Sequence, residues 1–209
     1  MRTRNRLAFT LIELLIVVAI IGILAAIAVP NFMNARTRAK LARVAGDMRN
    51  IGTAFGAYAV DHGEYPLGII SFLSPRQSDS WGFLPEGLTT PVAYMSSLPV
   101  DEFNLSYKIY GQQTVTGPEK KSDPHARYRT ARKKPYTGPG SRTDPVTWAA
   151  GWKTMMAKTG IDGNYILTSP GPDKVEDILP AYNPQPYSPT NGLASPGDIV
   201  YTDGGLSGI

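Results

Sequence analysis

The spacing of hydrophobic and polar positions changes near residue 30. From Leu11 to Val29 the chain reads LIELLIVVAIIGILAAIAV, nineteen residues in which only Glu13 and Gly22 differ from lipid-like side chains. As a helix, this run spans about 28 Å, close to the roughly 30 Å hydrocarbon core of a bilayer. The pattern predicts a helix that can cross a membrane and that carries one carboxylate near its start.

Beyond Pro30 the apolar positions become periodic. Six of them recur at spacings of 3, 4, 3, 4 and 3, which places them on one stripe of a helix: Leu41, Val44, Met48, Ile51, Phe55 and Tyr58. The charged residues around them suit a solvated face: Arg36, Arg38, Lys40, Arg43, Asp47 and Arg49. We expect one helix from about Phe9 to about Val60, weakened near Gly22 and at Pro30, which lacks a backbone donor. Gly63 and Pro66 then stop it.

The C-terminal third has the signature of short strands. Residues 164–169 (NYILTS) and 198–202 (DIVYT) are rich in β-branched and aromatic side chains, and residues 107–111 (YKIYG) form a weaker candidate. Between about 68 and 158 the chain is rich in Gly, Pro and Ser, so we expect that region to decorate the core. The prediction is an α+β fold in which a long helix packs on a small antiparallel C-terminal sheet.

A basic stretch at residues 119–142 raises the question of nucleic-acid binding. It contains eight basic residues: Lys120, Lys121, Arg127, Arg129, Arg132, Lys133, Lys134 and Arg142. Tyr128 and Tyr136 lie among them, which would suit stacking on bases. The Pro and Gly content and the lack of periodicity favour a solvated surface loop instead. Nucleic acid is therefore not an expected partner.

The distribution of charge predicts how the chain is oriented across the membrane. The formal charge is +4, but Arg2, Arg4 and Arg6 lie within the first eight residues, and without them 18 basic residues face 17 acidic ones. Because positive flanks stay cytoplasmic, we expect the N-terminus inside and the chain beyond Pro30 outside. There is no cysteine, which excludes a disulfide framework and thiolate zinc sites.

Three interpretations compete for the apolar segment. A cleaved secretory signal has a shorter core, although AAIAVP offers small residues suited to its cleavage site. A plain membrane anchor explains the length and the basic flank but not Glu13. An ionisable group in a membrane costs about 2.5–3.5 kcal/mol at mid-bilayer and less near the edge, so Glu13 points to a functional role.

The stretch AFTLIELL supports the third interpretation. It resembles the processing site of the type IV pilin and pseudopilin superfamily. The resemblance implies that a prepilin peptidase cuts between Ala8 and Phe9 and methylates the new Phe9 amine, which makes Glu13 the fifth residue of the mature chain. The family usually has Gly where this chain has Ala8, and because both are small we expect the cut to occur. The implied division is a leader (1–8), a transmembrane and assembly helix (9–30), its amphipathic continuation (31–62) and a head (63–209).

This resemblance suggests a role for the carboxylate. Glu13 of a docking subunit would pair with the Phe9 amine of its neighbour, which relieves two desolvation costs in a low-dielectric environment. Gly22 and Pro30 also fall where the family has its helix-loosening residues.

Two further stretches narrow the resemblance to the G-type major pseudopilins of type II secretion. Asp61, Gly63, Tyr65 and Pro66 match their helix-end pattern. LTSPGPDKVED and PGDIVY resemble their calcium-binding loop, which implies Asp173, Asp177 and Asp198 as ligands together with backbone oxygens near Leu167 and Ser169. The alternatives are an ordinary helix stop and a loop whose acids only keep it solvated.

The expected function is therefore structural. The resemblance implies a subunit of a type II secretion pseudopilus, or alternatively of a surface type IV pilus for adhesion, motility or DNA uptake. Expected partners are the membrane, further copies of the chain, other pseudopilins, prepilin peptidase and an assembly platform. The expected location is a single pass through the inner membrane with the head outside. No enzyme signature is present, and calcium is the one cofactor suggested.

Overall fold

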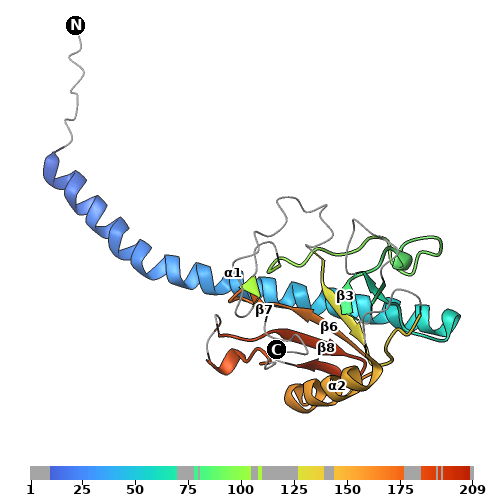
Figure 1. Cartoon of the computed structure of the whole chain (residues 1–209). Helices are drawn as coiled ribbons and strands as arrows, with labels where there is room; N and C mark the ends of the chain where they lie inside the picture. Colours follow the sequence, from blue (N-terminus) through green and yellow to red (C-terminus); the bar gives the residue numbers. More distant parts are fainter. Residues whose placement is uncertain are drawn as a thin grey trace, which may run out of the picture. The chain divides into compact units, whose positions relative to one another are not determined.

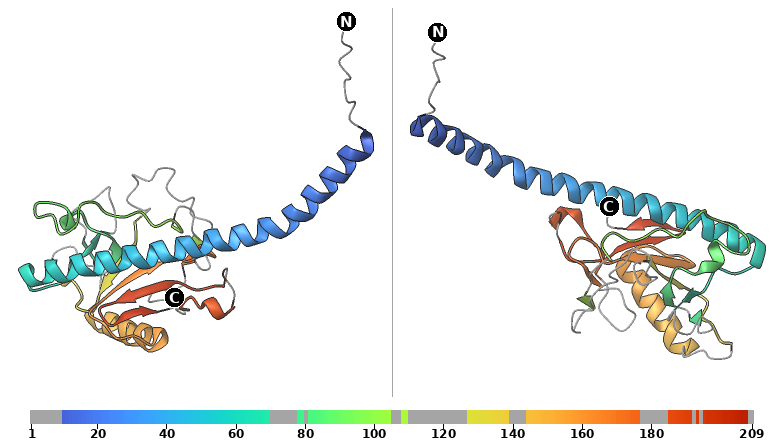
Figure 2. Two further views of the ribbon diagram at one scale, coloured as in Figure 1. Left: turned by 180° about the vertical axis from the view of Figure 1, so that it is seen from behind. Right: turned by 90° about the horizontal axis from the view of Figure 1, so that it is seen from above.

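The computed structural model describes residues 10–69, 78–79, 81–104, 108–109, 127–138, 144–176, 185–191, 193 and 195–207. The described chain divides into two compact units, Met1–Ala39 and Lys40–Ile209. One helix, α1 (Leu11–His62), contributes to both units, and Figures 1 and 2 show it with the strands and with α2. The predicted long helix is thus confirmed, and it extends two residues beyond the expected end.

The helix ends where the sequence indicated. Gly63 has a φ of +71° and its N–H donates to Ala59 O at 2.8 Å, the left-handed conformation in which glycine commonly terminates helices. Pro30 lies inside α1, where it cannot donate to the preceding turn.

The head contains a seven-stranded antiparallel sheet in the order β2-β1-β3-β5-β6-β8-β9. Its strands are β1 (Gly68–Ile69), β2 (Ser78–Asp79), β3 (Trp81–Phe83), β5 (Arg129–Arg132), β6 (Tyr165–Ser169), β8 (Ile199–Thr202) and β9 (Gly205–Ser207). Two short 3₁₀ turns, η1 (Glu86–Leu88) and η3 (Pro189–Asn191), lie in the connections. The two C-terminal strands predicted from the sequence are β6 and β8, and they pair directly, with Leu167 opposite Tyr201.

The sheet lies between two helices of the head, which Figure 1 shows for β6, β8 and α2 (Pro145–Thr159). Successive strand residues point to opposite faces. Tyr165, Leu167 and Ile199 pack with the α1 stripe, whereas Ile166 and Val200 pack with Trp152 and Met155 of α2. The stripe prediction is confirmed, with these exposed fractions: Leu41 5%, Val44 0%, Met48 0%, Ile51 0% and Phe55 0%.

The structure corrects several expectations. The region from about 68 to 158 does not only decorate the core, because β1, β2, β3 and β5 belong to the main sheet. The predicted strand at 107–111 forms as β4 (Lys108–Ile109), but it pairs in parallel with β7 (Val175–Glu176) in a separate two-stranded sheet and does not join β6 and β8. The basic stretch is not one solvated loop, because Arg129–Arg132 is an interior strand, β5, of the main sheet and Tyr128 is fully buried. Asp47 does not lie on a fully solvated face, because it is partly buried and accepts a hydrogen bond from Tyr128 Oη at 3.1 Å.

Candidate assembly segment and candidate calcium loop

Glu13 is held at the start of α1 by Thr10. The Thr10 N–H and Oγ1 both donate to Glu13 Oε2 at 2.8 Å, and the Glu13 N–H donates back to Thr10 Oγ1 at 3.3 Å. These reciprocal bonds form a capping box, which satisfies donors left open at a helix N-terminus. Sequence reasoning missed this pair, although the spacing Thr-x-x-Glu directly before an apolar run is its signature. Ala8 and Phe9, the predicted cleavage residues, lie outside the described part of the chain.

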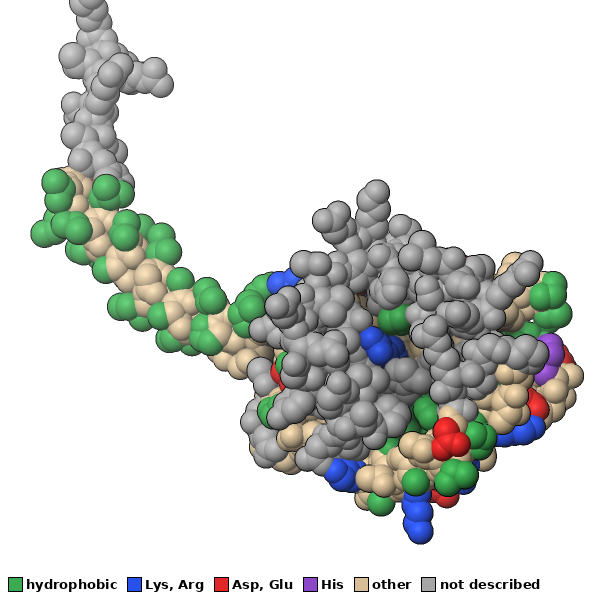
Figure 3. Space-filling view, in the orientation of Figure 1, with side chains coloured by type: hydrophobic (Ala, Val, Ile, Leu, Met, Phe, Trp, Pro, Cys, Tyr) green, Lys and Arg blue, Asp and Glu red, His purple; other side chains and the backbone are tan. Residues whose placement is uncertain are grey.

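Within its own unit, the apolar half of α1 packs against none of the described residues. Every described side chain from 10 to 36 is exposed, with Leu11 at 76% and Phe32 at 68%. Figure 3 shows this half covered by hydrophobic side chains. An 18-residue window of α1 is apolar enough to cross a membrane, and none of that window is buried. Since a surface of this size is unfavourable in water, the segment requires lipid or other apolar helices around it.

The residues at the end of α1 make contacts that stabilise the turn into the head. Asp61 Oδ2 accepts a hydrogen bond from Tyr94 Oη at 2.8 Å, the Tyr65 ring packs on Tyr165 at 4.9 Å, and Pro66 is buried. Together with the positive φ of Gly63, these contacts turn the chain from α1 toward β1. Each of the four residues of the Asp-x-Gly-x-Tyr-Pro pattern therefore has a physical function in this turn.

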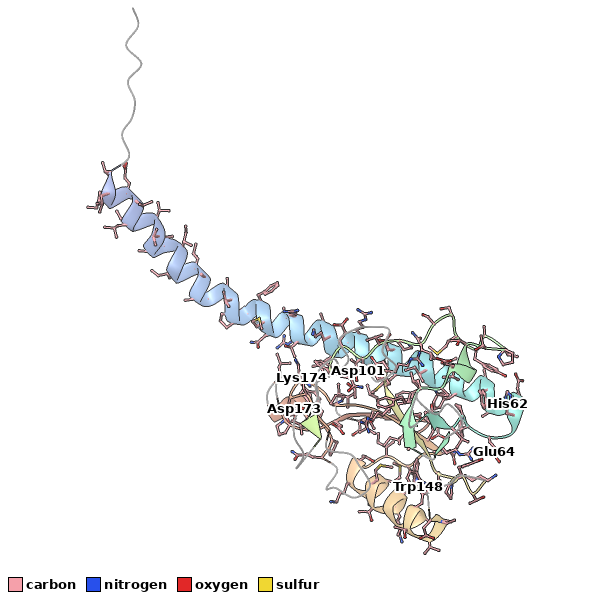
Figure 4. The ribbon with its side chains drawn as sticks, turned by 45° about the horizontal axis from the view of Figure 1, so that its top comes forward. His62, Glu64, Asp101, Trp148, Asp173 and Lys174 are labelled. Carbon is pink, nitrogen blue, oxygen red and sulfur yellow. The ribbon has the colours of Figure 1, made fainter. Side chains whose placement is uncertain are left out.

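The candidate calcium loop lies between β6 and β8. Asp173 connects its two ends, because Oδ1 accepts from Val175 N at 3.1 Å and Oδ2 accepts from Gly197 N at 3.2 Å. Burial raises the pKa of the Asp173 carboxyl. Gly171, at φ +68°, allows the two ends to meet, since a Cβ there would lie 2.7 Å from Gly197 O. In Figure 4, Asp173 and Lys174 lie at the opposite end of the head from His62 and Glu64.

The donor set of this loop fits a hard cation in part. Asp198 is fully buried at the start of β8, and Leu167 and Ser169 are buried on β6. The Ser169 side chain is buried and interacts with the Asp101 carboxyl group. Within the described residues no group of three Asp, Glu, His or Cys side chains forms a metal cluster. Calcium also takes backbone carbonyls, and Asp177, the third predicted carboxylate, lies outside the described residues.

A polar network that the sequence did not reveal ties the 101–104 segment to α1. Asp101 is fully buried, its Oδ1 accepts from Phe103 N at 2.9 Å, and burial raises its pKa to about 7. Glu102 pairs with Arg43 at 3.2 Å and with Lys40 at 3.8 Å. Burial also raises the pKa of Asp47. No local pattern predicts this network, because its members are far apart in sequence.

Comparisons with known proteins agree with the geometry of the N-terminal segment. Residues 3–29 match the family model described as the prokaryotic N-terminal methylation motif. The chain is similar to type II secretion system core protein G of Pseudomonas aeruginosa, with 34% identity over 114 residues, which covers 54% of this chain and 80% of the relative. The corresponding protein of Klebsiella michiganensis is 36% identical over 113 residues, covering 52% of this chain and 76% of that protein.

A second kind of relative is a type IV pilin. The type IV major pilin protein PilA of Myxococcus xanthus is 48% identical over 82 residues, which is 38% of this chain and 36% of PilA. No solved structure matches the chain. The coverage and identity of the first two relatives, together with the N-terminal methylation motif, show that this chain belongs to the type II secretion core protein G family within the pilin and pseudopilin superfamily.

Proposed function

We propose that this protein is a structural subunit of a type II secretion pseudopilus and polymerises through the apolar half of α1. The observation that carries the proposal is an exposed apolar helix that begins with a locally fixed carboxylate, Glu13, in a member of the core protein G family. A helix of this kind fits a bilayer before assembly and a bundle of identical helices after it.

The proposed assembly begins with a cut between Ala8 and Phe9 by prepilin peptidase, followed by methylation of the Phe9 amine. The new amine and Glu13 then lie at neighbouring levels of the mature helix. Pairing Glu13 of one subunit with the Phe9 amine of the next would fix the axial position, because both charges are costly to leave alone in apolar surroundings. Gly22 and Pro30 would loosen the helix as it moves from lipid to filament.

The proposed setting is the inner membrane, with the N-terminus cytoplasmic and the head outside. Other pseudopilins and an assembly platform would be the partners there, and the protein would act as a building block without catalysis of its own. This orientation follows from the proposed processing, because prepilin peptidase cuts on the cytoplasmic side and the leader with Arg2, Arg4 and Arg6 would lie there.

A surface type IV pilus is the second candidate. The similarity to PilA of Myxococcus xanthus over 82 residues favours it. That similarity covers only 36% of the pilin, whereas 80% of the Pseudomonas core protein G is covered, so the pseudopilus is the stronger proposal.

Calcium binding by the β6–β8 loop is a separate proposal. Asp173, Asp177 and Asp198, with backbone oxygens of Leu167 and Ser169, would hold the ion, which would supply a cross-link in a chain without cysteine. Addition of calcium should raise the melting temperature of the head, and a concentration of 100 times Kd corresponds to about 2.7 kcal/mol. Asp173→Asn should abolish the increase and Asp162→Asn should retain it. A melting temperature insensitive to calcium and chelator would refute the site.

The test of the main proposal is mass spectrometry of the N-terminal peptide in membranes and in sheared extracellular filaments. A methylated Phe9 end confined to membranes would support the pseudopilus. The same end abundant in sheared material would favour the pilus, and an intact leader in both fractions would contradict processing. Glu13→Ala should insert normally but fail to enter filaments, whereas Glu86→Ala, a head variant with the same charge change, should assemble.

A further inference from the structure

Two arginines follow the apolar half of α1. Arg36 and Arg38 are both exposed, and within the described residues neither pairs with a carboxylate. The next two basic residues differ, because Lys40 and Arg43 both pair with Glu102. No Asp or Glu occurs in the sequence between Glu13 and Asp47. Arg36 and Arg38 are therefore cations whose own stretch of helix offers no counter-charge.

The length of the helix sets the level at which these arginines lie in a membrane. With Glu13 at one edge of the hydrocarbon core, the residues from Leu14 to Met33 rise about 30 Å and fill that core. Arg36 and Arg38 then lie about 4–8 Å beyond Met33. The headgroup layer on each side of the core is about 5–8 Å thick, so both guanidinium groups fall within it.

We propose that Arg36 and Arg38 form a collar that binds the phosphates of anionic phospholipids in the leaflet nearest the head. A guanidinium group presents two parallel donors that match phosphate oxygens and retains its charge at any physiological pH. The proposal rests on the proposed insertion of α1 in the membrane, and it assigns a ligand to residues that the assembly proposal leaves unused.

The positions of the two arginines around the helix favour lipid over a second copy of the chain. Residues two apart on an α-helix point about 200° from one another, so Arg36 and Arg38 lie on opposite sides. A docked protein covers one side of a helix, whereas headgroups surround it. The flanking Phe32 and Met33 are also exposed, at 68% and 51%, which suits the boundary between lipid tails and headgroups.

The collar gains importance once the leader is removed. The proposed cut takes away Arg2, Arg4 and Arg6, which are the cations on the other side of the membrane. Arg36 and Arg38 are then the basic side chains next to the membrane, at the surface nearest the head. Their binding to headgroups would set the depth of the subunit in the bilayer. A basic residue near an anionic surface strengthens lipid binding by about fivefold.

The test uses the full-length chain in nanodiscs made of equal parts phosphatidylcholine and phosphatidylglycerol. Native mass spectrometry of the released protein gives the ratio of the two lipids that remain bound. All variants carry Gln in place of Arg2, Arg4 and Arg6, so that the leader does not contribute. The collar variant is Arg36→Gln with Arg38→Gln. The matched control is Arg49→Gln with Lys153→Gln, which removes the same charge from exposed positions of the unit Lys40–Ile209.

We expect the parent and the control to retain phosphatidylglycerol in excess, and the collar variant to lose at least about fivefold of this preference. Arg36→Lys with Arg38→Lys should retain only part of it, because an ammonium group keeps the charge but not the two parallel donors. An equal loss in the control, or no loss in the collar variant, would overturn the proposal. If the same mass spectra show dimers of the parent, their loss in the collar variant with an unchanged lipid ratio would overturn the proposal and assign the arginines to a second copy. Failure of the parent to enter the nanodisc would refute the membrane insertion itself.

Discussion

The two halves of α1 differ in where their apolar side chains find contacts. In the half beyond Lys40, the stripe from Leu41 to Phe55 is at most 5% exposed and packs on the sheet of the head. In the half before Met33, large apolar side chains are exposed, from 46% at Val17 to 76% at Leu11. One continuous helix thus contains a segment whose partner is in the same chain and a segment whose partner must come from outside.

This contrast separates folding from assembly along the sequence. A substitution in the packed half is expected to change the stability of the head, whereas a substitution in the exposed half is expected to change membrane insertion or subunit contacts. Matched residues of the same type occur in both halves, so the contrast can be tested with identical chemistry.

The largest expected effect comes from a pair of phenylalanines. Phe55 is fully buried and Phe32 is 68% exposed. Phe55→Ala should destabilise the head by about 3–5 kcal/mol, because it removes a core ring and leaves a cavity. Phe32→Ala should leave the unfolding midpoint of the head unchanged. Denaturant unfolding of the full chain in detergent, followed by near-ultraviolet circular dichroism, measures both, and similar losses in the two variants would break the comparison.

The stability of the head should depend on pH through one buried carboxyl group, that of Asp101. The pKa of Asp101 is about 7 in the fold and near 4 in an unfolded chain, so the folded state holds a proton that the unfolded state has released. The contribution of Asp101 to stability should therefore be greatest below about pH 4 and fall as the pH rises to about 7, by an amount on the order of 2–4 kcal/mol.

Asp101→Asn should remove most of this dependence, and Asp162→Asn, an exposed control, should retain it. Melting temperatures at pH 5 and pH 8 provide the measurement. Equal slopes for the two variants would show that the buried carboxyl of Asp101 is not the cause.

Two glycines of the packed half sharpen the comparison by changing stability in opposite directions. A Cβ at Gly52 would lie 2.5 Å from Tyr201 Cε1 and 2.8 Å from Tyr165 Oη, whereas nothing lies within 4 Å of the position at Gly56. Gly52→Ala should destabilise the head by about 1–3 kcal/mol, and Gly56→Ala should stabilise it by about 0.5–1 kcal/mol. Calorimetry can measure both. A stabilising Gly52→Ala would mean that the sheet does not approach α1 this closely.

The smallest effect is expected at the start of the exposed half. Thr10→Val removes the hydroxyl that completes the capping box and should weaken the first turn by about 1 kcal/mol. Amide exchange at Glu13 in micelles should then be about fivefold faster, with no change in the core amides around Met48. Unchanged exchange at Glu13 would show that the cap does not persist in a membrane-like environment.

Local patterns were sufficient for the parts of the fold whose partners are adjacent in sequence or repeat with a fixed period. The apolar run, the stripe from Leu41 to Phe55 and the strands β6 and β8 all follow from such patterns. The helix α2 was missed although its signals were present. Asp144 Oδ2 accepts from Thr147 N at 2.9 Å, Pro145 opens the helix, and Gly160 ends it at φ +70°.

Other features depended on residues far apart in sequence. Arg132 was expected on a solvated loop, but it lies in β5 at 7% exposure and its Nη1 binds Glu64 Oε2 at 2.7 Å. Burial of a guanidinium group is strongly unfavourable without such a partner. No residue near 132 in the sequence indicates that Glu64 provides it. The candidate functional residues also differ in how well the sequence predicts them. Glu13 is predicted because it is the one charged residue in an apolar run. Asp101 could be identified only from the fold, because its partner Ser169 is distant in sequence.

The capping bonds at the start of α1 use only one of the two carboxylate oxygens of Glu13. Both Thr10 donors converge on Glu13 Oε2, and among the described residues no donor reaches Oε1. A single side chain can therefore close its own helix with one oxygen and receive a neighbour's amine with the other. Because its rotamer is already fixed, little conformational freedom would be lost when a second subunit arrives. The Glu13 carboxylate would therefore hold its binding position for the incoming amine before the next subunit arrives.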